Sequence, residues 1–86
     1  MINSSFLWDD FYNRYVNNKE EFHFIYNNKE IDLSYALSKT NQLIVALSYG
    51  NDKDGFLWKD YSSPEMLLND TIFDGKTLKE IWNELS

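Results

Sequence analysis

Cysteine is absent from the 86-residue chain, which also has only one histidine, one proline and three glycines. Without cysteine there is no disulfide, no thiolate nucleophile and no cysteine-ligated zinc or iron–sulfur cluster. Small secreted domains usually depend on such cross-links, so we expect a cytoplasmic protein. The glycines are isolated from one another, and the glycine-rich pattern of a phosphate-binding loop is missing.

Basic residues are also scarce: seven lysines and one arginine stand against fourteen acidic residues, for a formal net charge of −6. Affinity for nucleic acid depends on basic side chains that neutralise phosphates, so this balance argues against direct binding to DNA or RNA. The same charge attracts a basic partner. No apolar run approaches the roughly 20 residues that cross a bilayer. We therefore expect no nucleic acid and no membrane as a direct partner.

Aromatic residues are abundant, and fifteen of the 86 residues are Phe, Tyr or Trp. Each of these side chains buries about 150–250 Å² in a core. A chain of this length forms one domain, because domains of roughly 50–200 residues share a single core. We therefore predict a single domain over residues 1–86 with an aromatic core.

The first apolar pattern has helical spacing. Steps of three and four residues place its apolar side chains on one stripe, and Ser4 or Ser5 precedes them as a helix cap. The pattern predicts an N-terminal helix. Its apolar positions are Leu7, Trp8, Phe11, Tyr12, Tyr15 and Val16.

From residue 22 the apolar period changes to two, which indicates strands with one buried face. Short polar turns separate four such segments, which predicts an antiparallel meander. The longest of these turns, over 50–55, is the most polar loop of the chain. On the last strand we expect Phe56 and Trp58 to face inward. The predicted strands cover 22–26, 31–37, 43–49 and 56–61.

Two helix-start signals follow the strands. Ser62-Ser63-Pro64-Glu65 combines a serine cap with proline at the first helical position. Thr77-Leu78-Lys79-Glu80 fits a capping box, and apolar residues continue from it at helical spacing. The predicted fold class is α+β: an N-terminal helix, a four-stranded antiparallel meander sheet and two short C-terminal helices, with the helices packed on one sheet face.

Three segments resemble a family of small uncharacterised proteins from low-GC Gram-positive bacteria and their phages. These are Phe24-Ile25-Tyr26-Asn27-Asn28-Lys29-Glu30-Ile31, Ser62-Ser63-Pro64-Glu65-Met66-Leu67-Leu68 and Asp74-Gly75-Lys76-Thr77-Leu78-Lys79-Glu80-Ile81-Trp82. The similarity spans about two thirds of the chain, and the last segment is its most distinctive part. The family implies no catalytic or binding residues.

Candidate catalytic groups are few. His23 is the only imidazole, and it alternates with phenylalanines, which places it on the less apolar face of its strand. We interpret it as a solvated side chain rather than a general base. A small enzyme built on His23 and nearby carboxylates is a hypothesis of lower rank, because a domain this small has little material for a catalytic cleft.

A calcium loop is the nearest metal motif, at Asp52-Lys53-Asp54-Gly55. Aligning Gly55 with the glycine of that motif puts Gly50 and Tyr61 at positions that require a carboxylate, which neither side chain supplies. Because the candidate catalytic group and the candidate metal motif both have simpler explanations, we expect no metal site, no cofactor and no catalytic residue.

A non-catalytic, acidic protein-binding module remains. One hypothesis is an inhibitor from a phage or mobile element, of the anti-defence (anti-CRISPR-like) or toxin-immunity kind, whose target is a basic nuclease or nucleic-acid-binding protein. The alternative is a self-associating or adaptor protein, for example a homodimer, in which edge strand 22–26 extends a partner's sheet. The residues expected at the partner interface are Asp52, Asp54, Asp60, Tyr49, Tyr61, Glu30 and Asp32.

Overall fold

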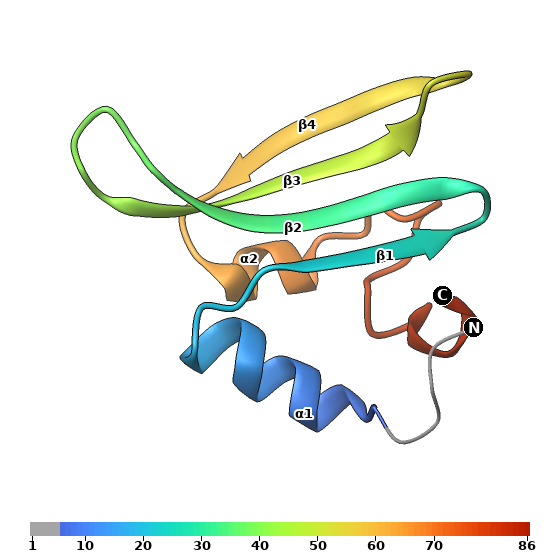
Figure 1. The fold of residues 1–86 in the computed structure, drawn as a ribbon, viewed down its shortest axis with the longest axis horizontal. Coiled ribbons are helices and arrows are strands. Elements are labelled where there is room, and N and C mark those ends of the chain that lie inside the picture. Colours follow the sequence, from blue (N-terminus) through green and yellow to red (C-terminus); the bar gives the residue numbers. More distant parts are fainter. Residues whose placement is uncertain (1–5) are drawn as a thin grey trace.

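A computed structural model describes residues 6–86 and has an α+β fold (Figure 1). Along the chain, one short α-helix precedes a four-stranded sheet and another follows it. A π-helical turn (Asn13–Asn17) extends the first helix, and a 3₁₀ turn (Trp82–Glu84) lies near residue 86. Over residues 6–86, no helix is long and apolar enough to span a bilayer. The elements are α1 (Trp8–Tyr12), β1 (Phe22–Tyr26), β2 (Lys29–Leu37), β3 (Leu43–Asn51), β4 (Gly55–Tyr61) and α2 (Pro64–Asn69).

The strands form an antiparallel sheet in the order β1-β2-β3-β4, which confirms the predicted meander. Asn27 and Asn28 connect β1 to β2 with φ angles of 51° and 65°. Asparagine tolerates this left-handed conformation better than most residues, which suits a tight hairpin. The turn between β3 and β4 is shorter than predicted, because β3 continues to Asn51 and only 52–54 lie outside the ladder.

Both α-helices and the segment after α2 lie on the same side of the sheet (Figure 1). Between them and the sheet is an aromatic core, in which the Phe11 ring stacks on Tyr15 and contacts Trp82 and Phe24. The predicted helical stripe is correct at Phe11, Tyr15 and Val16, which are buried.

Two positions of that stripe were predicted wrongly, because Leu7 and Tyr12 are exposed. Leu7 is the N-cap of the short helix α1 and precedes its first turn. The predicted cap at Ser4 or Ser5 lies outside the described residues.

The prediction that Phe56 and Trp58 face inward is wrong. In the register of β3 with β4, Tyr49 is opposite Leu57 and Ser48 is opposite Trp58. Residues directly opposite each other share a sheet face, so Leu57 lies on the covered side and Trp58 on the other. Because β4 has apolar residues at both parities, its own pattern does not define the buried face; pairing with β3 does.

The segment after α2 contains one of the predicted features but not the expected helix. The capping box forms, since the Thr77 N–H donates to Glu80 Oε1 at 2.8 Å and the Glu80 N–H donates to Thr77 Oγ1 at 3.3 Å. Turns follow, ending in the 3₁₀ turn, and Leu85 is extended at φ −80° and ψ 154°. The extended backbone lets Ser86 pair with Ile25 of β1. Only α2 is therefore a regular helix after the sheet.

Candidate functional site

One face of the sheet has no helix packed on it within the part of the chain that the structure describes (Figure 1). We call this surface the open face. Its members follow from strand register, because residues opposite each other share a face and the buried residues define the other side. The open face consists of His23, Ile25, Glu30, Asp32, Ser34, Ala36, Ile44, Ala46, Ser48, Gly50, Phe56, Trp58 and Asp60.

The charge of the open face has one sign. It carries the carboxylates of Glu30, Asp32 and Asp60, and none of its members is a lysine or an arginine. The two lysines of the sheet, Lys29 and Lys59, belong to the covered face by the same register. Because the open face has carboxylates but no lysine or arginine, it attracts positively charged groups.

A row of four side chains crosses all strands on this face. His23, Asp32, Ser48 and Trp58 are consecutive partners in the register. Ser48 Oγ donates to Asp32 Oδ2 at 3.3 Å, and His23 Nε2 lies 3.9 Å from Asp32 Oδ1. The carboxylate is thus in the middle of the row. In a nucleophilic triad the imidazole takes that place and contacts the serine, so this order differs from that of an activated serine.

Trp58 is the most exposed large apolar side chain of residues 6–86, at 74%. Its ring lies beside that of Phe56, with centroids 6.0 Å apart. Tryptophan is enriched among the residues that contribute most to protein interfaces, since it combines a large apolar area with an N–H donor. The sequence pattern did not predict this role, because it indicated that Trp58 faces inward.

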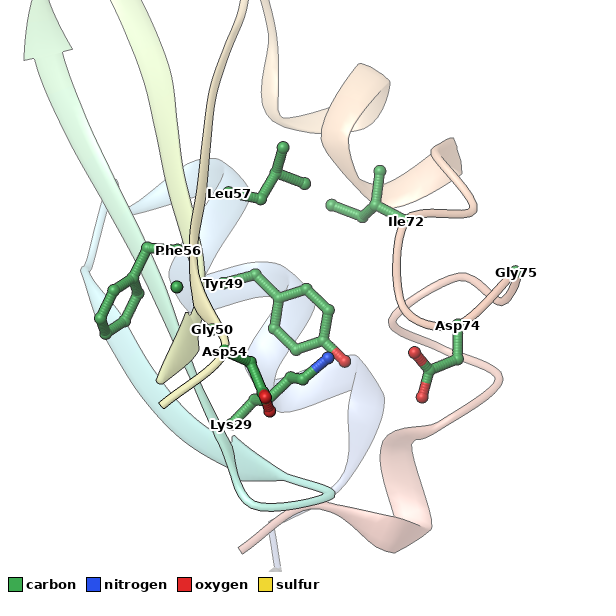
Figure 2. Close-up of a pocket in the computed structure, with 10 residues that line it drawn as sticks. Lys29, Tyr49, Gly50, Asp54, Phe56, Leu57, Ile72, Asp74 and Gly75 are labelled. Carbon is green, nitrogen blue, oxygen red and sulfur yellow. The ribbon is translucent and has the colours of Figure 1, made fainter. Parts of the chain in front are cut away.

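A pocket of about 470 Å³ lies on the covered side, at the end of the sheet (Figure 2). Leu57 and Ile72 supply apolar lining, and Lys29 Nζ lies 5.3 Å from the centroid of the Tyr49 ring. The Tyr49 hydroxyl is buried and has no hydrogen-bond partner among the described residues. Burial, with a smaller contribution from Asp74, raises the pKa of Tyr49 to about 12, so the hydroxyl remains a donor at neutral pH.

The structure divides the seven predicted interface residues among different surfaces. Glu30, Asp32 and Asp60 lie on the open face. Tyr49 and Asp54 line the pocket of Figure 2, and Asp52 is exposed in the neighbouring turn.

Tyr61 lies apart from the carboxylates of the open face. It is buried on the covered side, where its hydroxyl donates to Asp70 Oδ2 at 2.8 Å. A second pocket, of about 440 Å³, includes both Tyr61 and its neighbour Asp60 in its lining. The two buried tyrosines, Tyr49 and Tyr61, present little surface to a partner.

The chain was compared with protein-family models, curated proteins and solved structures, and no match was found. The resemblance of residues 74–82 to a phage-associated family therefore remains a prediction.

Proposed function

We propose that this protein is a non-catalytic binding module that docks on a basic protein through its open face. The observation that carries the proposal is Trp58, a 74% exposed tryptophan on an uncovered and acidic sheet face. A side chain of this size gains more from burial at an interface than any other on that face. The surrounding carboxylates supply complementarity to lysine and arginine side chains.

A basic nuclease or nucleic-acid-binding protein is the proposed partner class. The net charge of −6 accelerates the encounter with such a surface, and salt weakens this steering. Binding to the basic surface of the partner blocks the lysine and arginine side chains that otherwise contact phosphates, so the module acts as an inhibitor. The resemblance of residues 74–82 to phage-associated proteins supports an origin in a phage or mobile element, of the anti-defence or toxin-immunity kind.

Self-association is a second candidate, and β4 is the observation that favours it. Among the described residues, the backbone hydrogen bonds of β4 are those of its ladder with β3, and none reaches its other edge. An open edge can pair with the same strand of a second copy. The resulting continuous sheet would place two open faces side by side.

The test compares capture of host proteins by the wild type, Trp58→Ala and Met66→Ala. The control residue Met66 is also a large exposed apolar side chain, at 54%, but it lies on α2 on the other side of the sheet. The proposal predicts a stoichiometric basic protein, released as salt rises, that Trp58→Ala loses and Met66→Ala retains. The captured protein is then purified, and its activity on nucleic acid is measured with and without the module.

Equal capture by both variants would contradict docking through the open face. Unimpaired activity of the captured protein would contradict inhibition. Sedimentation of the isolated chain at high concentration addresses the second candidate, which predicts a dimer. A strictly monomeric species would remove it.

A further inference from the structure

Three metal-ligating side chains converge on the open face, from β1 and β2. One nitrogen of His23 and one oxygen each of Glu30 and Asp32 all lie within 4.8 Å of one another. His23 Nε2 is 3.1 Å from Glu30 Oε1 and 3.9 Å from Asp32 Oδ1. Each side chain is about half exposed, so an ion from solvent can reach all three.

We propose that His23, Glu30 and Asp32 form a zinc-binding site. Imidazole nitrogen and carboxylate oxygen are both ordinary zinc ligands, with bond lengths of about 2.0–2.2 Å. Tetrahedral coordination at these lengths places ligand atoms roughly 3.3–3.5 Å apart. The two distances from the imidazole, 3.1 and 3.9 Å, bracket that value. Small side-chain rotations therefore suffice to seat the ion.

The surroundings of the cluster favour a cation. The imidazole supplies a nitrogen ligand, which a patch of carboxylates lacks. Magnesium and calcium sites use oxygen ligands, so this nitrogen favours zinc. Within residues 6–86, neither Glu30 nor Asp32 forms an ion pair with a lysine or arginine. Two carboxylates thus face one imidazole, and a divalent ion neutralises them.

The cluster is also held in place. Its members stand on neighbouring paired strands, where Asp32 is directly opposite His23 and Glu30, opposite Ile25, is two residue pairs away on the same face. Ser48, which is 6% exposed, donates a hydrogen bond to Asp32 Oδ2 and leaves Asp32 Oδ1 to face His23. Hydrogen bonds of this kind orient metal ligands. Three protein ligands leave a fourth position for water or for a side chain of a partner.

The test titrates zinc chloride into the full, untagged chain and follows both heat and the imidazole NMR signals. With one histidine and no cysteine in the chain, an imidazole signal that moves reports on His23 alone. The proposal predicts saturable 1:1 binding, which His23→Ala weakens by more than about tenfold and Ser48→Ala by about tenfold.

A matched pair of variants separates ligation from general charge. Asp32→Asn and Asp60→Asn each remove one negative charge from the open face, but only Asp32 belongs to the cluster. Asp32→Asn is expected to weaken zinc binding by more than about tenfold. Asp60→Asn is expected to weaken it by less than about twofold, because Asp60 stands on β4, with β3 between it and the cluster, and salt screens separated surface charges.

Three results would overturn the proposal: equal losses in the two Asn variants, zinc binding that leaves the His23 signals unmoved, or no saturable binding. The last is the result expected if the His23 imidazole only contacts the two carboxylates and the three side chains hold no ion. The titration needs no protein partner, so its outcome is independent of the docking proposal.

Discussion

Ile25 of β1 and Ser86 exchange two backbone hydrogen bonds, with the Ile25 N–H donating at 3.1 Å and the Ser86 N–H at 2.9 Å. Both bonds lie on the edge of β1 that faces away from β2. The backbone groups that an added strand would use at Ile25 are therefore already paired. This reduces the edge available for the sheet extension predicted from residues 22–26, and leaves β4 as the open edge.

The bridge between Ile25 and Ser86 is expected to contribute to stability. Ser86→Pro removes the N–H that donates to Ile25, whereas Ser86→Ala keeps it. Leu85 is already in the extended conformation that a following proline requires. We expect Ser86→Pro to lower the free energy of unfolding by about 1 kcal/mol relative to Ser86→Ala, measured by urea denaturation. Equal stability of the two variants would mean that the bridge contributes nothing measurable.

Truncation of a side chain is expected to change the free energy of unfolding little on the open face and strongly on the covered face. Trp58→Ala removes a side chain that is exposed in the monomer and should change the free energy of unfolding by less than about 0.5 kcal/mol. Leu33→Ala removes a side chain that is 1% exposed in the core and should cost about 3 kcal/mol. Thermal or urea unfolding of both variants checks the face assignment, and a large loss in Trp58→Ala would refute it.

Gly50 is required by the close approach of β3 and β4. Its φ is +155°, and a Cβ there would lie 2.0 Å from the backbone oxygen of Gly55. Gly75 has φ +81°, but a Cβ at that position meets nothing within 4 Å.

The two glycines therefore make a matched pair of substitutions. We expect Gly75→Ala to cost about 1–2 kcal/mol from backbone conformation alone. Gly50→Ala should cost about 3 kcal/mol or more, because the strands must also separate. Denaturant unfolding ranks the two variants, and a smaller loss at Gly50 would contradict the strand geometry.

Asp70 connects α2 to β4 and makes stability depend on pH. Lys59 Nζ donates to Asp70 Oδ2 at 2.7 Å, and the Tyr61 hydroxyl donates to the same oxygen at 2.8 Å. Hydrogen bonding by Lys59, then by Tyr61, lowers the pKa of Asp70 below its ordinary 3.8. The folded state thus favours the carboxylate, and this stabilisation exists above pH 3.8 and disappears as pH falls through the lowered pKa.

Asp70→Asn tests this linkage. At pH 7 we expect a loss of about 1 kcal/mol, since bonds to a charged group are strong but this one is partly exposed to solvent. The difference between wild type and variant should shrink as pH falls below about 4, where the Asp70 carboxyl of the unfolded chain takes up a proton before that of the folded chain. Urea unfolding from pH 3 to pH 7 measures it. A difference that does not change with pH would show that the charge of Asp70 is irrelevant.

Local signals in the sequence predicted most of the backbone. Apolar alternation and the polar turns between the segments located the strands, Asn27 and Asn28 located the first turn, and Ser63 with Pro64 located the start of α2, where Ser63 Oγ accepts from the Met66 N–H at 3.3 Å. Each of these features depends on residues close together in the chain. The capping box at Thr77 was also found, but it did not reveal that the chain turns to an extended conformation at Leu85.

The functional site depended on pairing between strands, which local patterns do not contain. His23 was recognised as a polar residue of its strand and Glu30 as a candidate interface residue just before the predicted strand 31–37, but their contact requires the register of β1 with β2. Trp58 was misplaced because β4 has apolar residues at both parities, and its register with β3 puts the ring on the open face.

By itself, the sequence determined the α+β class, the meander, the aromatic core and the acidic charge, because these follow from composition and local periodicity. Only the tertiary structure decided which face of β4 is buried, that Ser86 pairs with β1, and that His23, Glu30 and Asp32 meet. Those contacts depend on which strand partners which, and on the single side of the sheet where α1, α2 and residues 73–86 find space to pack.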